Sequence, residues 1–378
     1  MTNPIVFKGG AAFDGEILHK DAAMRFGESG LEAIGPVEQI KGDAQVIDLG
    51  DDLISPGYVD LQVNGGGGVM LNTAPSVEAI RTIAKAHWSL GTRALLPTLI
   101  TDTREKTQAA IAAVSDAIAE DIPGVIGLHL EGPHLSVTRK GAHDAAHIRK
   151  MDQADLEMLL QAARSLPALM ITIAPENVSL DQVRVLSDAG AVVSLGHTDA
   201  DFATCMAYVD AGARCATHLF NAMSQLGNRE PGLVGAALSS GNLSVGLIAD
   251  GIHVHTDTMK IALSAKQGPG QIFLVSDSMA VAGSNLTTFE LDGRRIFRAD
   301  GKLTLENGTL AGADLDLTTA IRVLVTDVGI PLNQALKAAT KTPHDLISSI
   351  PFDVTGRHVT DFIRIRPDLT GVTPLMAS

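Results

Sequence analysis

Short apolar runs alternate with longer segments of helical period along most of the chain from residue 55 onward. Strands and helices that alternate in this way form a parallel sheet covered by helices. Eight of the apolar runs have the length of strands, and eight is the strand number of a (β/α)8 barrel. The predicted strands are residues 58–64, 92–98, 125–131, 168–174, 191–197, 214–218, 243–249 and 272–277.

Two of the helices predicted between these strands have clear limits. Residues 201–212 place apolar side chains at positions i, i+3, i+4 and i+7 and end in a glycine. Residues 317–328 carry a second apolar stripe, which ends at Gly329 and Pro331. Both segments are therefore predicted to be amphipathic helices.

The two ends of the chain carry a different pattern. Within residues 1–55, short apolar runs alternate with Gly, Asp and Lys turns, which is typical of short antiparallel strands. Short mixed runs return after Pro343, and we expect the last residues to rejoin the N-terminal strands. The predicted fold is α/β, with a (β/α)8 TIM-type barrel over residues 56–343 and a small β-sandwich domain built from residues 1–55 and 344–378.

Composition narrows the classes of function. The 29 Lys and Arg residues against 43 Asp and Glu give a net charge of −14, which argues against a general nucleic-acid or anionic-membrane surface. Residues 1–7 lack the apolar core of a signal peptide, and no apolar run reaches the roughly 18 residues of a membrane span. We therefore expect a cytoplasmic protein. Its two cysteines lack Cys-x-x-Cys spacing, so a metal would be held by His and carboxylates.

Four of the predicted strands end in residues that bind metals or transfer protons, namely Glu131, His197, His218 and Asp277. In (β/α)8 barrels the catalytic groups lie at the carboxyl ends of the strands. A single polar residue there is most often a cap or a turn former, but four together favour a site. Two His and one carboxylate bind a catalytic Zn²⁺ or a similar ion and leave one position open for water. The remaining Asp277 is then free to act as a base.

Further candidates lie at the end of the first strand and on loops that follow strands. Gln62 and Asn64 alternate onto one strand face, and because amides are poorer metal ligands than imidazoles, a hydrogen-bonding role is favoured. Asn221, Arg229 and the segment from Asp250 to His253 carry donors that can bind a phosphate in a locally basic pocket. The alternative is that these loop residues are merely solvated.

Taken in order, these motifs resemble those of N-acetylglucosamine-6-phosphate deacetylases, members of the amidohydrolase superfamily. The resemblance covers about residues 50 to 345 and is specific, because the superfamily at large shares the barrel and the metal ligands but not this set of loops. The motifs that carry it are residues 56–65, 127–134 (Gly-Leu-His-Leu-Glu-Gly-Pro-His), 140–143, 196–198, 216–223 (Ala-Thr-His-Leu-Phe-Asn-Ala-Met), 229–232 and 249–253.

The resemblance implies a role for each matching residue. Glu131, His197 and His218 would hold one divalent ion, with Gln62 and Asn64 standing where many amidohydrolases have His-x-His and a second ion. Asp277 would be the catalytic residue. The implied substrate contacts are His143 and Ala142 for the acetamido group, Asn221, Ala222, Arg229 and His253 for the phosphate and sugar, and the Leu310, Ala311 and Gly312 loop, which would close over the substrate; Asp250 is a supporting residue.

The implied activity is the hydrolysis of N-acetylglucosamine 6-phosphate to glucosamine 6-phosphate and acetate, in amino-sugar catabolism and cell-wall recycling. The resemblance also suggests a homodimer in which Arg229 reaches the neighbouring subunit's site. Zn²⁺ is the first candidate for the ion, and Fe²⁺, Mn²⁺ and Co²⁺ remain open. The galactosamine epimer of the substrate remains open as well.

Two other functions are less consistent with the sequence. Another amidohydrolase, such as a cyclic amidase or a purine deaminase, is disfavoured by Gln62 and Asn64 and by the absence of a lysine at the end of the fourth strand. A non-catalytic barrel is disfavoured by the complete set of four ionisable groups at strand ends.

Overall fold

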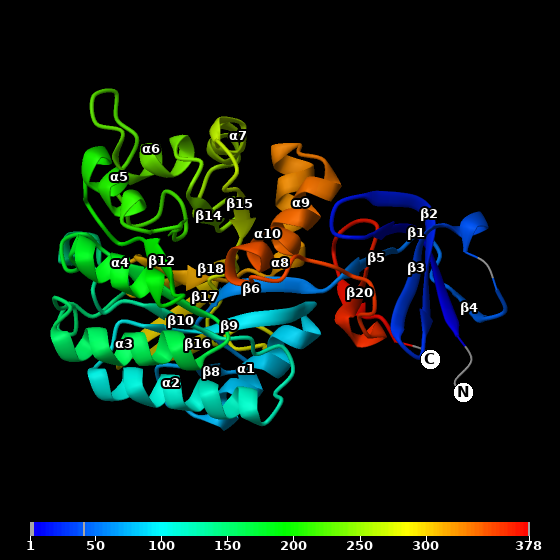
Figure 1. Ribbon diagram of the computed structural model, residues 1–378, viewed down its shortest axis with the longest axis horizontal. Helices are drawn as coiled ribbons and strands as arrows, with labels where there is room; N and C mark the ends of the chain where they lie inside the picture. Colours follow the sequence, from blue (N-terminus) through cyan, green and yellow to red (C-terminus); the bar gives the residue numbers. More distant parts are fainter. Residues whose placement is uncertain (1–3, 41, 377–378) are drawn as a thin grey trace.

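Eight parallel strands form the centre of the protein, which the computed structural model describes over residues 4–40 and 42–376. A parallel bridge between Val63 and Ser278 joins the first strand to the segment after the last, so that the sheet is nearly closed into a barrel. All eight predicted strands are found, and the predicted (β/α)8 fold is confirmed (Figure 1). In spatial order the strands are β6 (Tyr58–Val63), β9 (Thr92–Ile100), β10 (Leu128–Glu131), β11 (Leu169–Ile173), β12 (Val192–Leu195), β13 (Cys215–Ala216), β14 (Ser244–Leu247) and β15 (Ile272–Leu274).

Ten α-helices, within the described residues, connect and cover these strands. The helix predicted at residues 201–212 is α5, with the Asp201 side chain accepting a hydrogen bond from Thr204 as its N-cap. The stripe at residues 317–328 is α8 followed by a π-helical turn, Leu324–Val328, which ends at Gly329 with a positive φ of 84°. The helices are α1 (Val77–Ser89), α2 (Arg104–Ala119), α3 (Gln153–Ser165), α4 (Leu180–Asp188), α5 (Phe202–Asp210), α6 (Gly232–Ser239), α7 (Thr256–Ala265), α8 (Leu317–Val323), α9 (Leu332–Ala339) and α10 (Lys341–Ile347).

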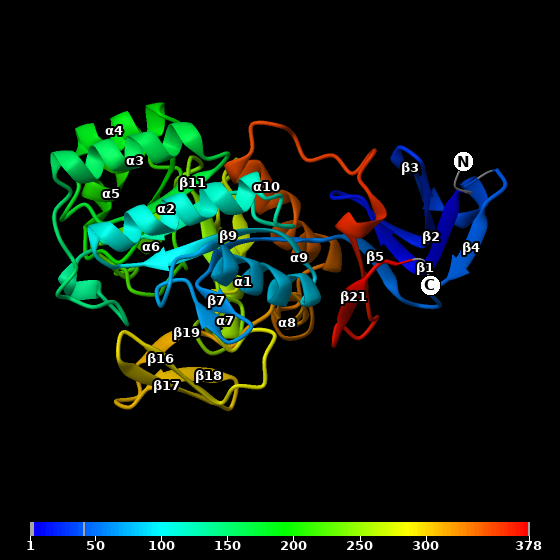
Figure 2. The same cartoon turned by 90° about the horizontal axis from the view of Figure 1, so that it is seen from below.

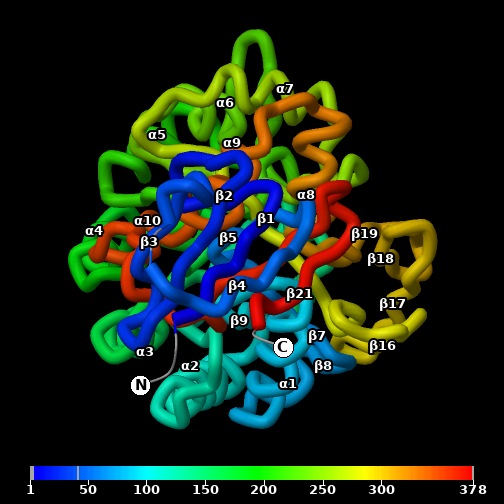
Figure 3. The backbone as a smooth tube through the Cα atoms, turned by 90° about the vertical axis from the view of Figure 1, so that its right-hand side faces the viewer, coloured from blue at the N-terminus to red at the C-terminus, as the bar shows by residue number. Residues whose placement is uncertain are grey.

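A small β domain lies beside the barrel and contains both ends of the described chain (Figures 1 and 3). Strand β20 pairs antiparallel with β5, so the C-terminal segment rejoins the N-terminal strands. The prediction of antiparallel strands is right for β1, β2 and β3 but wrong for β4, which runs parallel to β1, because the spacing of apolar residues does not determine the direction of pairing. Strand β5 runs parallel to β1 and antiparallel to β20. The seven strands are β1 (Ile5–Phe13), β2 (Leu18–Gly27), β3 (Gly30–Pro36), β4 (Gln45–Asp48), β5 (Leu53–Pro56), β20 (Phe362–Ile365) and β21 (Val372–Pro374).

An antiparallel sheet that the sequence analysis did not predict follows β15. Asp292-Gly293 and Asp300-Gly301 form its first two turns with positive φ at both residues, which is the geometry that Asp-Gly favours in hairpins. Its apolar side chains, among them Leu291 and Leu303, pack on Met279 beside the barrel mouth, and Figure 2 shows the sheet on the opposite side from α3 and α4. The strands are β16 (Thr288–Leu291), β17 (Arg294–Ala299), β18 (Lys302–Leu305) and β19 (Leu310–Ala313); a further short hairpin joins β7 (Gly65–Gly66) to β8 (Val69–Met70).

In the part of the chain that the structure describes, none of the helices combines the length and the apolar character needed to cross a membrane.

Asp155 links α3 to its surroundings through two arginines and sets a pH-dependent contribution to stability. Its carboxylate is fully buried and accepts hydrogen bonds from Arg104 Nε at 2.9 Å and Arg149 Nη2 at 3.1 Å. Burial alone would raise the pKa of Asp155, but the two arginines outweigh burial and hold the pKa below its usual value. This contribution to folding is present above the unfolded-state pKa of about 3.9 and is lost as the pH falls through the lower folded-state pKa.

Replacing Asp155 by Asn is expected to lower the free energy of unfolding at pH 7 by about 2 to 3 kcal/mol, because it leaves Arg149 without its charged partner and Arg104 with Asp152 alone. Urea unfolding at pH 7 and pH 3.5 tests this, and the difference from the unmodified protein should shrink at the lower pH. Asp181→Asn is the matched control, since Asp181 is 91% exposed in its pair with Arg184. An equal loss at both pH values would contradict the assignment.

Candidate functional site

A cavity of about 240 Å³ opens at the carboxyl ends of the barrel strands and brings together most of the candidate residues. Glu131 ends β10, while His197, His218 and Asp277 follow β12, β13 and β15 within three residues. The cavity is also lined by candidates from the loops and from the β16–β19 sheet, namely Asn64, Ala142, His143, Asn221, Ala222, His253, Leu310 and Gly312.

Three of the strand-end residues have backbone conformations that side chains rarely adopt. The φ angles are 47° at His197, 31° at His218 and 48° at Asp277. A positive φ turns the chain sharply out of the strand, and in residues other than glycine it costs free energy that the surrounding structure must offset. Such strain concentrates at functional sites, so these three positions are marked by geometry as well as by residue type.

The side chains of Glu131, His197 and His218 converge on one another. Glu131 Oε1 lies 3.1 Å from His197 Nε2 and 3.0 Å from His218 Nε2, and the two ring nitrogens are 3.1 Å apart. All three residues are buried. Three electron-rich atoms so close together repel one another unless protons or a cation lie between them.

Charge effects in this cluster favour a positive charge at its centre. Burial alone would raise the pKa of Glu131, but the rings of His197 and His218 outweigh burial and hold its pKa well below the usual value. Burial alone would lower the pKa of His218, yet bonding to Glu131 raises it. Two imidazoles and a carboxylate form the donor set of mononuclear catalytic ions, and in a tetrahedral Zn²⁺ site the donor atoms lie about 3.3 Å apart. The donor set and its spacing therefore fit a single divalent ion.

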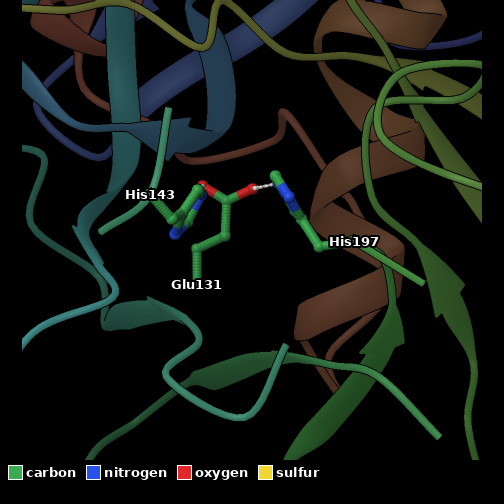
Figure 4. Close-up of side chains that lie close together, drawn as sticks. All are labelled: Glu131, His143 and His197. Carbon is green, nitrogen blue, oxygen red and sulfur yellow. Dashed lines mark hydrogen bonds and ion pairs between the residues drawn. The ribbon is translucent and has the colours of Figure 1, made fainter. Parts of the chain in front are cut away.

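His143 lies beside this cluster and forms a second possible triad with Glu131 and His197 (Figure 4). Its Nδ1 lies 2.8 Å from Thr101 Oγ1 and 3.3 Å from the Thr101 backbone N–H. Because a backbone N–H can only donate, the second contact favours Nδ1 as the acceptor and Nε2 as the nitrogen that carries the ring proton. Burial and the neighbouring His197 lower the pKa of His143 to about 3, which keeps the ring neutral at pH 7. His143 is thus prepared to donate a hydrogen bond rather than to ligate an ion.

His197 has the opposite arrangement. Its Nδ1 donates to the Arg139 carbonyl oxygen at 2.8 Å, which leaves Nε2 with a free lone pair facing Glu131 and His218. A ring held in this way by a carbonyl is typical of metal-binding histidines. The two rings therefore differ in which nitrogen carries the proton, and this difference separates a ligand from a donor.

Asp277 is held by the two amides of the first strand. Gln62 Nε2 and Asn64 Nδ2 donate hydrogen bonds of 3.1 and 2.7 Å to Asp277 Oδ1. Burial, followed by repulsion from Glu131, raises the pKa of Asp277 above its usual value, while Asn64 opposes the shift. A carboxylate with a raised pKa is a better proton acceptor, and this one faces the same cavity as the Glu131 cluster.

The ring of His253 is held in place by a hydrogen bond to Asp250. Its Nδ1 donates to Asp250 Oδ2 at 2.6 Å, and Asp250 Oδ1 accepts the backbone N–H groups of Ile252 and His253 at 2.8 Å. Asp250 does not line the cavity; it fixes the ring of His253, which does. Nε2 of His253 is left for a ligand.

Besides Asp250, three candidates lie outside the cavity lining. Arg229 is exposed on the loop before α6, Ala311 is buried within β19, and Gln62 lies beneath Asp277. The loop is fastened by Glu230, whose Oε1 accepts from the backbone of Phe202 at 2.7 Å and of Gly232 at 3.0 Å. Within one chain, therefore, Arg229 does not face the residues expected to share a phosphate with it.

Two kinds of residue contribute to the site but are not among the candidates predicted from the sequence. Thr101 and the Arg139 carbonyl orient His143 and His197, but nothing in the sequence pairs residues that are far apart along the chain. Leu291 and Thr309 line the cavity from the β16–β19 sheet. For that sheet a signal exists, since Asp-Gly and Asn-Gly pairs separate its strands.

Comparison with known proteins gives one family and a consistent set of relatives. Residues 53–348 match the model of the amidohydrolase family. The chain is 44% identical over 291 residues to N-acetylgalactosamine-6-phosphate deacetylase of Shewanella sp. (strain ANA-3), covering 77% of this chain and 73% of the relative. It is 33% identical over 331 residues to N-acetylglucosamine-6-phosphate deacetylase of Haemophilus influenzae, covering 87% and 85%.

Solved structures of similar fold include enzymes of the same name as these relatives. The crystal structure of N-acetylglucosamine-6-phosphate deacetylase from Pasteurella multocida superposes with a TM-score of 0.89 at 30% identity, covering 98% of this chain and 97% of that one. A mutant of the Mycobacterium smegmatis enzyme in complex with N-acetyl-D-glucosamine-6-phosphate gives a TM-score of 0.90 at 27% identity, covering 99% and 98%.

Proposed function

The chain belongs to the amidohydrolase family, as a relative of its N-acetylhexosamine-6-phosphate deacetylases, and on that basis we propose that it hydrolyses N-acetylglucosamine 6-phosphate to glucosamine 6-phosphate and acetate. The observation that carries the proposal is the meeting of Glu131, His197, His218 and Asp277 at one cavity with the donor His143. Because sugar phosphates are charged and do not cross membranes unaided, we place the reaction in the cytoplasm, within amino-sugar catabolism and cell-wall recycling.

Glu131, His197 and His218 would hold one divalent ion, which supplies Lewis acidity and lowers the pKa of water toward about 7. We take Zn²⁺ as the first candidate, with Fe²⁺, Mn²⁺ and Co²⁺ as alternatives that the same donors accept. The fixed lone pair of His197 and the low pKa of Glu131 support this assignment.

The remaining steps follow from the side chains around the cavity. Asp277 takes a proton from the water that attacks the acetamide carbonyl, and it then delivers that proton to the departing amine. His143 donates from Nε2 to the carbonyl oxygen as negative charge develops there, and the Ala142 backbone borders the same part of the cavity. The bond broken joins the carbonyl carbon to the amine nitrogen, and the products are acetate and the free amino sugar phosphate.

We assign the phosphate and the sugar to the loop residues that line the cavity. These are His253, fixed by Asp250, together with Asn221 and Ala222, and Leu310, Ala311 and Gly312 belong to the strand that borders the cavity. The exposed position of Arg229 supports a homodimer in which this residue reaches the neighbouring subunit's cavity. A sugar phosphate then contacts both subunits.

A second candidate substrate is N-acetylgalactosamine 6-phosphate. The relative with 44% identity carries that activity in its name, and the two sugars differ only in the configuration at C4. The same residues hydrolyse either acetamide, so the distinction lies in the contacts to the sugar ring. Acetate release from both sugar phosphates decides between them.

The phosphate is expected to contribute strongly to specificity. Hydrogen bonds that a phosphate accepts from charged side chains contribute about 1.5 to 3 kcal/mol each, so the unphosphorylated N-acetyl sugar should have a kcat/KM lower by at least about tenfold. Arg229→Ala should narrow this gap. The measurement is acetate release from the phosphorylated and the unphosphorylated sugar, for the unmodified protein and for Arg229→Ala.

Arg184→Ala is the control for that comparison, because Arg184 is an exposed arginine on α4 that pairs with Asp181. It should leave the difference in kcat/KM between the two sugars unchanged.

Light scattering should give about twice the chain mass of 39.5 kDa if the protein is a dimer. Equal kcat/KM values for the sugar with and without phosphate would overturn the assignment of the cavity to a sugar phosphate.

A further inference from the structure

The barrel closes at a seam where its first and last strands, β6 and β15, are not joined by a ladder in the described residues. Near the mouth, the backbone N–H groups of Asn64 and Gly65 donate to the Ser278 carbonyl oxygen at 3.0 and 3.2 Å. Deeper in the barrel, the Asp60 side chain accepts the hydrogen bonds at the seam. Asp60 Oδ1 accepts from the backbone N–H of Ser276 and from that of Gln62, each at 3.2 Å.

Both backbone groups that Asp60 holds belong to residues that place Asp277. Ser276 directly precedes Asp277, whose φ of 48° requires the chain to turn sharply at this point. Gln62 donates its side-chain amide to Asp277 Oδ1 at 3.1 Å. One carboxylate oxygen therefore fixes the backbone on both sides of the seam, next to the carboxyl group that faces the cavity.

We propose that Asp60 is a positioning residue for Asp277, which acts by holding the backbone N–H groups of Ser276 and Gln62 across the seam. The inference rests on the proposed role of Asp277 as the base. It assigns to Asp60 a function as a hydrogen-bond acceptor and not as a second base or a metal ligand.

The surroundings of Asp60 are consistent with this assignment. The residue is fully buried and does not line the cavity, so it touches neither substrate nor water from the mouth. Its second oxygen, Oδ2, has no hydrogen-bond partner among the described residues. Burial raises the pKa of Asp60 to about 7, although Ser276 and Gln62 oppose the shift. A buried carboxyl group that bonds through one oxygen serves as an acceptor whether or not it carries a proton.

The test compares Asp60→Ala with Asp60→Asn, measuring kcat, KM and metal content. Asp60→Ala removes the acceptor, and kcat should fall by about 10- to 100-fold, as expected when a base is misplaced but still present, while KM and metal content stay within about threefold of the unmodified protein. Asp60→Asn keeps an acceptor oxygen and should restore kcat to within about threefold of the unmodified value. A merely structural role would not give this split between kcat and KM or this rescue.

Thr98→Val provides the matched control. Thr98 is equally buried and its Oγ1 accepts from the Val63 backbone N–H at 2.9 Å, so it also fixes β6, but on the side away from Asp277. The kcat of this variant should stay within about twofold of that of the unmodified protein, because loss of the Thr98 hydrogen bond leaves the contacts of Asp277 intact. If Asp60→Ala does not fold, Asp60→Leu replaces it, since a leucine side chain fills the space of the carboxyl group and offers no acceptor.

A crystal structure of the Asp60 variant separates this inference from the proposed function. The distances from Gln62 Nε2 and Asn64 Nδ2 to Asp277 Oδ1, which are 3.1 and 2.7 Å here, should lengthen beyond hydrogen-bonding range. If neither sugar phosphate is hydrolysed by the unmodified protein, the proposed function fails, and these distances still decide the role of Asp60. An unmoved Asp277, or an Asp60→Asn variant as slow as Asp60→Ala, would overturn the proposal.

Discussion

Replacing Asp277 by Asn is expected to lower kcat by about 10²- to 10⁴-fold or more, with metal content close to that of the unmodified protein. The substitution keeps the shape of the side chain and one oxygen for Gln62 and Asn64, but it removes the group that accepts the proton of the attacking water. The Glu131, His197 and His218 donors are untouched. Loss of turnover without loss of metal is therefore the signature of a base.

The control for Asp277→Asn is Asp257→Asn. The Asp257 side chain is 84% exposed in its pair with His255 at the start of α7, and Asp257 is not part of the cavity lining. Its substitution makes the same chemical change and should leave kcat within about twofold, as surface substitutions away from a site usually do. A kcat within tenfold of normal in Asp277→Asn would remove Asp277 from the mechanism.

The barrel was predictable because its strands are buried on both faces and therefore appear as continuous apolar runs. The same property revealed the strand-end residues, since Glu131, His197, His218 and Asp277 each interrupt or follow such a run directly. The strand ends of a barrel all point to one face, so residues far apart in sequence could be expected at one cavity. The structure brings all four together there.

Hydrogen-bond partners were not predictable in the same way. Gln62 and Asn64 were expected to form hydrogen bonds, but only the closed barrel places them against Asp277, more than 200 residues further along the chain. Which nitrogen of a histidine carries the proton depends on the contact made by the other nitrogen, and Thr101 and Arg139 supply those contacts from separate loops. Residue type alone does not separate His143 from His197.

Pairing direction and loop position were the other limits. The parallel pairing of β4 with β1 depends on the path of the connection between them and not on residue pattern. Arg229 was grouped with His253 because both follow barrel strands, but its loop is directed by the contacts of Glu230 and leaves the arginine exposed. Individual contacts of this kind determine the path of a loop. The sequence of a loop therefore indicates which chemical groups it carries better than it indicates where those groups point.

Replacing His218 by Ala is expected to reduce the metal content from about one ion per chain to a small fraction and to abolish activity in proportion, because it removes one of the three ligands of a site that needs them all. His143→Ala is the discriminating control: although His143 forms a compact triad with Glu131 and His197, its ring nitrogen toward the cavity carries the proton. That variant should lose activity but keep its metal. Metal analysis of both variants after gentle purification gives the result. If His218→Ala keeps its metal and His143→Ala loses it, the ligands are Glu131, His143 and His197 in place of Glu131, His197 and His218. Two tightly bound ions in the unmodified protein, with Gln62 or Asn64 as ligands, would contradict the single-ion proposal and the bonds that both amides make with Asp277.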